Sequence, residues 1–209
     1  MVASVGLKRR VLRDDVVEHI VDSILNGYLK PGDKIIETRI SRELQVSQGA
    51  VREAIRDLTA RGFVETEPYK GSRVKILSSG ELYEYYAVRS ELEPLALGWG
   101  FELNRIDVDK LADAVERMFS GVEEKDMTVV GQADLDFHRT IMECSGNGSL
   151  VRSWEVLAND YWMFSLAKEH FEKGMDLSVH AREHLKIVEA INIGDLELMK
   201  ELLKDHFSL

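Results

Sequence analysis

The 209-residue chain carries 27 Lys and Arg residues against 37 Asp and Glu residues, a formal net charge of −10, and 44% of its residues are hydrophobic. This length suits one large domain or two small ones, and the single cysteine, Cys144, excludes an intrachain disulfide framework and a cysteine-rich zinc site. The sequence has no apolar run of about 18 residues and no apolar signal segment at its start. We therefore expect no membrane contact and a cytoplasmic location.

The charge is divided unevenly along the chain. Residues 1–77 hold 14 basic and 11 acidic side chains, a net charge of +3, whereas residues 78–209 hold 13 basic and 26 acidic ones, a net charge of −13. Nucleic-acid phosphates attract positive charge, so only the first part is suited to contact them. The sequence predicts a mildly basic module followed by a strongly acidic one.

The first part contains three predicted helices. Asp14 or Asp15 is a suitable N-cap for a first helix that ends at Gly27, and a second helix is expected at about residues 38–44. The third helix begins after the N-cap residue Ser47 and stops at Gly62, with an apolar stripe on one face made of Val51, Ala54, Ile55 and Leu58. Helix, short turn and helix form a helix-turn-helix motif.

A β-hairpin is predicted directly after these helices. Residues 63–67 and 72–76 each alternate apolar and polar side chains, and they flank a turn with the sequence Pro-Tyr-Lys-Gly at 68–71. Three helices and a hairpin make a winged helix-turn-helix domain, which we expect at residues 1–77.

Long polar side chains follow one side of the third helix. Gln48, Arg52 and Arg56 are four residues apart and therefore project from successive turns. Such side chains near a helix N-terminus are suited to read base edges in the major groove. As an alternative, Arg52 and Arg56 are solvated or pair with acidic neighbours on their own helix. Further candidates for contact with the DNA backbone are Arg39 and Arg42 on the preceding helix, and Lys70 and Gly71 at the hairpin tip.

The whole pattern of this first part resembles a known family. The matching segments are Gly27-Tyr-Leu-Lys-Pro-Gly32, Leu44-Gln-Val-Ser47, Val51-Arg-Glu-Ala-Ile55, Leu58, Gly62-Phe-Val64 and Gly71. In this order they resemble the DNA-binding domain of the GntR family of bacterial transcription regulators, over residues 11–76. The resemblance implies that Ser47, Arg52 and Gly71 contact DNA. The family usually has arginine where this chain has Gln48, and glutamine pairs best with adenine, so we expect a changed operator base there.

The second part is predicted to be helical almost throughout. Residues 78–80, Ser-Ser-Gly, are the expected linker, and breaks at 146–149 and 193–195 separate several of the helices that follow. This pattern predicts an all-α helical bundle at residues 81–209. The expected helices lie at about residues 81–102, 107–122, 126–145, 149–171, 176–193 and 195–207.

Histidine and aspartate positions in the second part suggest a metal site. Asp134 and His138 are four residues apart on one predicted helix face, and His184 and His206 lie on two helices joined by a tight turn. Three imidazoles and one carboxylate suit a divalent transition metal such as Zn, Ni, Mn or Fe. Spacing alone leaves two alternatives, a surface ion pair of Asp134 with His138 and a competing pair of His180 with His184.

A second resemblance favours the metal. The segments Asp134-Leu-Asp-Phe-His-Arg139, Ser145-Gly-Asn147, His184-Leu-Lys-Ile-Val-Glu-Ala-Ile191 and Gly194-Asp195, followed by His206, are similar to the all-α effector domain of the FadR subfamily, the FCD domain. The similarity covers about residues 80–207 and implies a metal held by Asp134, His138, His184 and His206. The fatty acyl-CoA-responsive branch lacks this set, which argues against acyl-CoA as the ligand.

The resemblance also implies a small organic acid as effector, of the citrate, lactate or sugar-acid kind. Arg89 matches an arginine of the family's first effector-domain helix and is a candidate to bind a carboxylate bidentately. Its alternative partner is Glu93, four residues further on the same helix. Asn159 is a further candidate on its polarity alone, whereas the tryptophans are more typical of a core.

These observations together predict a ligand-responsive transcription regulator that acts as a repressor, and no catalytic residue. Two recognition helices reading two half-sites require a homodimer and a near-palindromic operator. Two alternatives remain open. One is a metalloenzyme, because a site of this composition can activate water; the other is a regulator whose metal is structural or is itself the signal.

Overall fold

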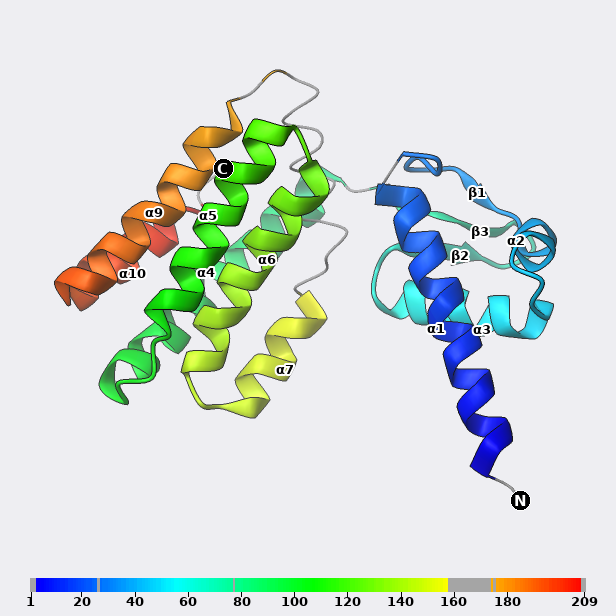
Figure 1. The fold of residues 1–209 in the computed structure, drawn as a ribbon, viewed down its shortest axis with the longest axis horizontal. Helices are drawn as coiled ribbons and strands as arrows, with labels where there is room; N and C mark the ends of the chain where they lie inside the picture. The colour runs from blue at the N-terminus through cyan, green and yellow to red at the C-terminus, as the bar shows by residue number, and fades with distance from the viewer. Residues whose placement is uncertain (1–2, 26, 77, 158–173, 175, 208–209) are drawn as a thin grey trace. The chain divides into compact units, whose positions relative to one another are not determined.

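The chain divides into two compact units, Met1–Leu77 and Ser78–Leu209 (Figure 1). The structure, a computed structural model, describes residues 3–25, 27–76, 78–157, 174 and 176–207. The described part is mostly helical with one small sheet in the first unit, which confirms the predicted fold class. None of the described helices combines the length and the apolar character needed to cross a membrane.

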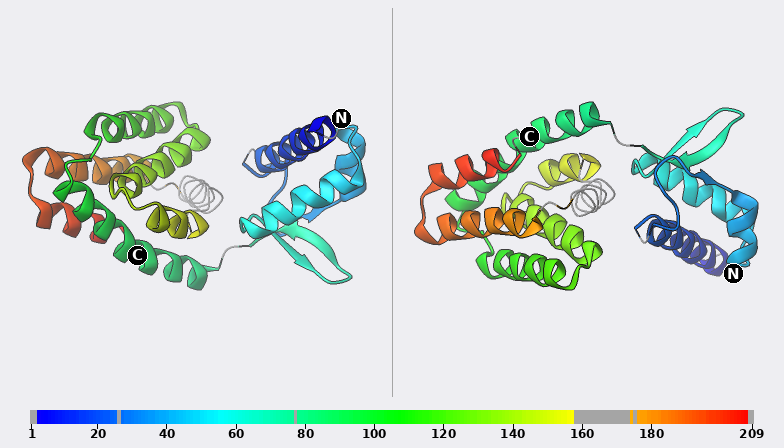
Figure 2. Two further views of the ribbon diagram at one scale, coloured as in Figure 1. Left: turned by 90° about the horizontal axis from the view of Figure 1, so that it is seen from below. Right: turned by 90° about the horizontal axis from the view of Figure 1, so that it is seen from above.

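The first unit is a winged helix. The antiparallel hairpin of β2 and β3 forms the wing, and a short strand β1 that the sequence did not reveal pairs with β3, giving the strand order β1-β3-β2. Figure 2 shows the hairpin standing out from the helices. The elements are α1 (Ala3–Leu25), β1 (Lys34–Ile35), α2 (Glu37–Glu43), α3 (Gln48–Ala60), β2 (Val64–Glu67) and β3 (Gly71–Val74).

The predicted start of the first helix is wrong. Helix α1 begins at Ala3, so Asp14 and Asp15 lie within it and cap nothing. An Asp side chain marks a helix start only where the preceding chain leaves the helix, whereas here Asp14 accepts a hydrogen bond of 2.9 Å from Arg13 Nε. The end is as predicted, because Gly27 takes a φ of +74° just after the helix.

The core of the first unit fixes α3 by its apolar face. Val51, Ala54 and Leu58 are completely buried, and α3 packs against α1. Ser47 caps the helix, since its side chain accepts a hydrogen bond from the Ala50 N–H, and Gly62 follows its end with a φ of +77°. The opposite face of α3 is therefore held out in solvent.

The second unit is a bundle in which α6 is the central helix. It packs against α4, α5 and α7, while α10 packs on α4 and α9 (Figure 1). The helix predicted at 149–171 is α7 as far as its described end, and the rest lies outside the described residues. The described helices are α4 (Ser79–Glu102), α5 (Val108–Glu124), α6 (Met127–Cys144), α7 (Gly148–Leu157), α9 (Leu177–Ile193) and α10 (Leu196–Asp205).

The expected linker at residues 78–80 is instead the start of α4. Ser78 Oγ accepts a hydrogen bond from the Glu81 N–H, and Glu81 Oε2 accepts one from the Ser78 N–H, at 3.1 and 3.2 Å. This capping box stabilises the first turn. The Ser-x-x-Glu pattern that signals it was present in the sequence, but Gly80 suggested a break.

Helices α4 and α6 approach closely because α4 has a glycine, Gly100, where it faces α6. A Cβ atom at Gly100 would lie 2.1 Å from Cys144 Sγ, so no larger residue fits without movement. This approach sets the position of α6, which carries two of the predicted metal ligands, against α4, which carries Arg89.

Candidate metal centre and nucleic-acid interface

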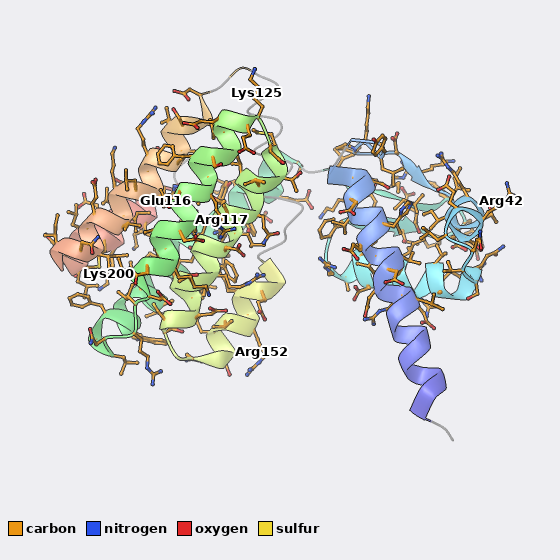
Figure 3. All side chains as sticks on the ribbon, viewed as in Figure 1. Arg42, Glu116, Arg117, Lys125, Arg152 and Lys200 are labelled. Carbon is orange, nitrogen blue, oxygen red and sulfur yellow. The ribbon has the colours of Figure 1, made fainter. Side chains whose placement is uncertain are left out.

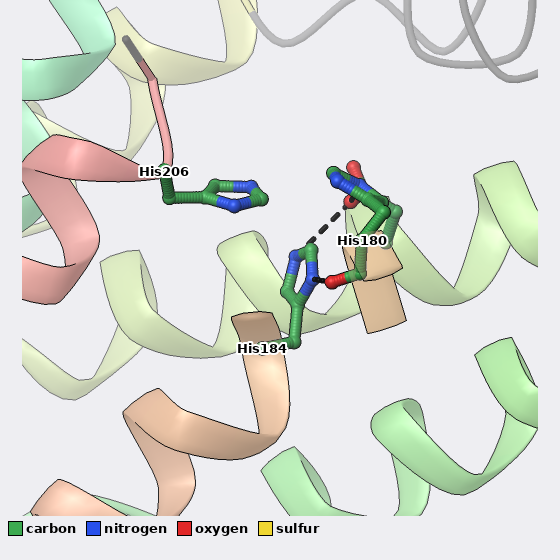
Figure 4. Close-up of side chains that lie close together, drawn as sticks. His180, His184 and His206 are labelled. Carbon is green, nitrogen blue, oxygen red and sulfur yellow. Dashed lines mark hydrogen bonds and ion pairs between the residues drawn. The ribbon is translucent and has the colours of Figure 1, made fainter. Parts of the chain in front are cut away.

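Four side chains from three helices of the second unit meet at one point. Asp134 comes from the middle of α6, His180 and His184 from the first half of α9, and His206 from the residue that ends α10. One ligand atom of each lies within 4.8 Å of those of the others. Figure 4 shows the three imidazole rings gathered around this point.

A single oxygen, Asp134 Oδ1, is the centre of the cluster. It lies 2.8 Å from His180 Nε2, 3.1 Å from His184 Nε2 and 3.8 Å from His138 Nε2. The last two nitrogens are themselves 3.2 Å apart. Five potential ligand residues, the four of the cluster and His138, therefore surround a small volume in the core of the bundle.

The protonation of His184 follows from its hydrogen bond. Its Nδ1 lies 2.9 Å from the backbone oxygen of His180, and because a carbonyl only accepts, Nδ1 carries the hydrogen. Burial is the main reason that the pKa of His184 is lowered to about 4, so the ring is neutral at pH 7. Its Nε2 then has a free lone pair, and this lone pair faces the Asp134 carboxylate.

The orientation of His138 is fixed from the other side by Glu93. His138 Nδ1 donates to Glu93 Oε2 at 2.6 Å, which turns Nε2 toward the cluster. Glu93 Oε1 also accepts from Arg89 Nε at 2.6 Å and from Trp154 Nε1 at 2.7 Å. Burial raises the pKa of Glu93, but the charge of Arg89 and the hydrogen bonds from His138 and Trp154 outweigh it and lower the pKa overall. A carboxylate on the far nitrogen of a histidine is the usual outer support of a metal ligand.

Two buried polar atoms of the cluster have no hydrogen-bond partner among the described residues. They are Asp134 Oδ2 and His206 Nδ1, although the latter lies 3.4 Å from an oxygen of Glu183. Burial raises the pKa of Asp134, but the surrounding histidines lower it well below its usual value, so the side chain is a carboxylate. Burial lowers the pKa of His206 well below its usual value, so that ring is neutral.

The cluster is thus rich in lone pairs and negative charge and poor in hydrogen atoms. Buried acceptors without donors are costly, and a cation satisfies all of them at once. Imidazole nitrogens with one carboxylate oxygen are the donors that Zn²⁺ and its neighbours in the first transition row prefer. The residues present fit a divalent transition metal.

The four predicted ligands lie close together, and one further residue, His180, joins them. Asp134, His184 and His206 belong to the compact group, and His138 borders it through its contacts with the first two. His180, which the sequence offered only as a competing partner of His184, is the added member. The contact of Glu93 with His138 could not be predicted from the sequence, because 45 residues separate the two and no local pattern joins them.

The structure gives less support to the two predicted effector contacts, Arg89 and Asn159, than to the metal ligands. Arg89 is completely buried and pairs with Glu93, so the alternative partner is observed, in the core and not on the surface. Its Nη1 also donates to the Tyr85 hydroxyl at 3.2 Å. A contact of Arg89 with an effector stays a prediction, and Asn159 lies outside the described residues.

The predicted DNA contacts on α3 are exposed. Gln48 is the first residue of the helix, next to the capping side chain of Ser47. Arg52 pairs with Glu37 of α2, with 2.7 Å between Nε and Oε2, and not with an acidic neighbour on its own helix. Arg56 has no ion pair within the part of the chain that the structure describes, so it is free to reach a ligand.

The remaining predicted contacts lie on α2 and on the wing. Arg39 pairs with Glu43 at 2.7 Å, and Arg42 projects from α2 into solvent (Figure 3). On the wing, Lys70 pairs with Glu67 and Gly71 takes a φ of +86°. Tyr69, next to Lys70, is fully exposed and also has a positive φ, and it was not among the predicted contacts.

Comparison with known proteins identifies the family. Residues 12–74 match the bacterial regulatory proteins of the gntR family, and residues 84–209 match the FCD domain. The chain belongs to the GntR family of transcription regulators. It is therefore a DNA-binding transcription regulator and not an enzyme, which removes the metalloenzyme alternative.

Individual relatives agree with this assignment. The chain is 32% identical over 200 residues to a protein of Paenarthrobacter nicotinovorans named "Probable D-xylose utilization operon transcriptional repressor", covering 96% of this chain and 87% of the relative. It is 27% identical over 192 residues to the gluconate operon transcriptional repressor of Bacillus licheniformis, with coverage of 88% and 77%. A solved GntR regulator from Rhodococcus sp. RHA1 shares the fold, with a TM-score of 0.79, 24% identity and 93% coverage of both chains.

Proposed function

We propose that this GntR-family protein is a cytoplasmic, ligand-responsive repressor whose FCD unit holds a divalent transition metal and a small carboxylate effector. The observation that carries the proposal is the convergence of imidazole nitrogens on Asp134 Oδ1, at 2.8 to 3.8 Å. A purely structural ion pair needs one histidine there. Several imidazole rings around one buried carboxylate, two of them, His184 and His206, kept neutral by burial, suit a cation better.

The proposed metal ligands are the four residues that the family resemblance implies. The geometry of His138 supports this set, because Glu93 turns its Nε2 toward Asp134 and His184. A bound ion supplies positive charge for the oxygens of an organic acid. The donor set does not distinguish Zn, Ni, Mn and Fe. The ligands are Asp134, His138, His184 and His206.

The proposed DNA surface is the exposed face of α3 with the wing. Arg52 is held by an exposed ion pair with Glu37, with 60% and 33% of the two side chains accessible. An exposed pair contributes about 0–1 kcal/mol, so Arg52 can exchange Glu37 for a base edge at little cost. We assign Ser47, Gln48, Arg52 and Arg56 to the major groove, and Arg39, Arg42, Lys70 and Gly71 to the backbone or the minor groove.

A homodimer on a near-palindromic operator belongs to the same proposal. The first unit has a net charge of only +3, so one copy makes few phosphate contacts and binds weakly. The FCD unit, with a net charge of −13, is repelled by phosphate. Affinity and specificity therefore require two first units on two half-sites.

The proposed effector is a small organic acid of the sugar-acid or hydroxy-acid kind. The proposal of a carbohydrate-derived ligand is supported by the names of two relatives, "Probable D-xylose utilization operon transcriptional repressor" and "Gluconate operon transcriptional repressor". Arg89, and Asn159 by its polarity, are the proposed contacts besides the metal. An acid that binds one arrangement of the bundle better than another shifts the population toward it and alters the spacing of the recognition helices.

The DNA assignment is tested with duplexes selected by the protein from a random pool. Replacing Arg52 with alanine removes a base contact, which costs about 1–3 kcal/mol, or about 5- to 150-fold in affinity. Arg152 in the FCD unit is exposed and not assigned to DNA (Figure 3), so Arg152→Ala is the matched loss of charge. Operator affinity that Arg52→Ala leaves unchanged contradicts the assignment.

The metal assignment is tested by elemental analysis of the purified full chain. We expect one divalent metal ion per chain in the wild type and none in the His184→Ala/His206→Ala double variant. A wild type without metal, or a double variant with its full share, counts against the site. If metal is present but citrate and D-gluconate leave the melting temperature of the loaded protein unchanged, the metal is structural or is itself the signal.

A further inference from the structure

The five potential ligand residues differ in how far solvent reaches them. The side chains of Asp134 and His206 are 3% exposed, and those of His138 and His184 are completely buried. The side chain of His180 is 34% exposed. A small molecule that enters from solvent therefore meets His180 before the other four.

His180 is nevertheless close enough to act as a ligand. Its Nε2 lies 2.8 Å from Asp134 Oδ1, the shortest distance in the cluster, and its ring centroid lies 4.6 Å from that of His184 and 4.9 Å from that of His206. In Figure 4 its ring lies across from that of His206, and the ring of His184 lies below the two. A metal held by Asp134, His184 and His206 leaves His180 within reach, as it does His138.

The two remaining histidines are supported very differently. His138 Nδ1 donates to a fully buried carboxylate, Glu93, at 2.6 Å. His180 Nδ1 lies 3.9 Å from Glu183, whose side chain is 45% exposed, and His180 stands near the start of α9. Outer partners hold a metal ligand in place, so His138 is the fixed ligand and His180 the one most easily lost.

We propose that His180 is a fifth, exchangeable metal ligand that occupies the effector's place until a small carboxylate replaces it. This inference rests on the proposed metal site. In the exchange the bond between the metal and His180 Nε2 breaks and a bond from the metal to a carboxylate oxygen forms, with no change of oxidation state. The other four donors keep the metal in place. The effector thus competes with a residue of the chain itself, and its binding releases the side chain of His180 in the first turn of α9.

Competition predicts that removing His180 helps the effector. If His180 occupies the coordination position about nine-tenths of the time, its loss tightens carboxylate binding about tenfold, because the carboxylate no longer has to displace His180 from the metal. The same substitution lowers the number of protein ligands without removing the site. His180→Ala is therefore expected to keep its metal and to change its coordination.

The experiment uses the full chain loaded with Co²⁺, whose visible absorption reports the number and type of ligands. We expect the His180→Ala spectrum without acid to differ from that of the wild type, and citrate to bind this variant about tenfold more tightly. His19→Ala, in the first unit, is the matched control and should behave as the wild type. Identical spectra and equal citrate affinities for the wild type and His180→Ala overturn the inference.

Two further measurements separate the outcomes. If the wild type binds no Co²⁺, the proposed metal site fails and the inference fails with it. If the wild type binds Co²⁺ and Asp134→Ala does not, the site stands, and the behaviour of His180→Ala alone decides the inference. Should that variant fold poorly by circular dichroism, proton NMR of the Co²⁺-loaded wild type decides: citrate should remove one of four hyperfine-shifted imidazole signals, and four that persist contradict the exchange.

Discussion

Each unit of the molecule contains an arginine that pairs with a glutamate at nearly the same distance. In the winged helix, Arg52 Nε lies 2.7 Å from Glu37, and 60% of the arginine side chain is exposed. In the bundle, Arg89 Nε lies 2.6 Å from Glu93, and neither side chain is exposed at all. The chemistry is the same, and only the surroundings differ.

The difference separates a replaceable contact from a fixed one. The exposed pair is worth about 0–1 kcal/mol, so Arg52 can leave Glu37 for another acceptor. Breaking the buried pair leaves a charge without a partner in a medium of low dielectric constant, at about 3–5 kcal/mol. Glu93 also accepts hydrogen bonds from Trp154 and His138. The surface proposed for DNA is thus built from exchangeable contacts, whereas the buried Glu93 network that supports the proposed metal ligand His138 is permanent.

The largest effect is expected from breaking the buried pair. Glu93→Ala leaves Arg89, Trp154 and His138 without their common acceptor and should lower the free energy of unfolding by about 3–5 kcal/mol. Glu37→Ala, the matched change in the exposed pair, should lower it by less than about 1 kcal/mol. Urea unfolding followed by circular dichroism in the presence of EDTA measures both. Equal losses would remove the distinction between the two pairs.

Two aspartates on α6 differ in the same way as the two ion pairs. Asp134 is 3% exposed and lies among the histidines, whereas Asp136 is 30% exposed and pairs with Arg117 at 3.0 Å. Loss of an outer partner of a metal ligand costs about 10–100-fold in metal affinity, so Asp134→Asn, which alters a ligand itself, should cost about a hundredfold or more. Asp136→Asn should leave the affinity unchanged. Calorimetric titration with Zn²⁺ measures the affinity of both variants. Equal affinities would show that Asp134 is not a ligand of the ion.

The smallest expected effect comes from two glycines of α4. A Cβ at Gly100 would clash with Cys144 Sγ at 2.1 Å, whereas a Cβ at Gly80 meets no atom within 4 Å. Gly100→Ala should destabilise the protein by about 1–3 kcal/mol through overpacking. Gly80→Ala should stabilise it by about 0.4–1 kcal/mol, because the unfolded chain loses freedom. Thermal unfolding gives the sign of each change, and a neutral Gly100→Ala would show that α4 and α6 separate readily.

Local features were predictable from the sequence. The Ser47 cap and the hairpin depend on residues a few positions apart, and four-residue spacing placed Asp134 and His138 on one face of α6. The start of α1 and the capping box at Ser78 are also local, but there competing cap and break signals led to wrong boundaries.

Contacts between distant segments were not predictable in the same way. Fifteen residues separate Arg52 from Glu37, and 45 separate His138 from Glu93. The presence of His180 in the cluster depends on how α9 packs, since its spacing to His184 suits a helix face with or without a metal. Packing decides which of several equally spaced side chains meet, and no period in the sequence records it.

The central claim is that the bundle's metal site controls DNA binding by the winged helix. It is tested most directly by the fluorescence anisotropy of a labelled operator duplex bound to the full chain, titrated with citrate and with D-gluconate. The protein is compared after loading with Zn²⁺ and after removal of metal by EDTA. The account predicts that at least one acid releases DNA from the loaded protein and that the metal-free protein does not respond. Release that is identical with and without metal would contradict it.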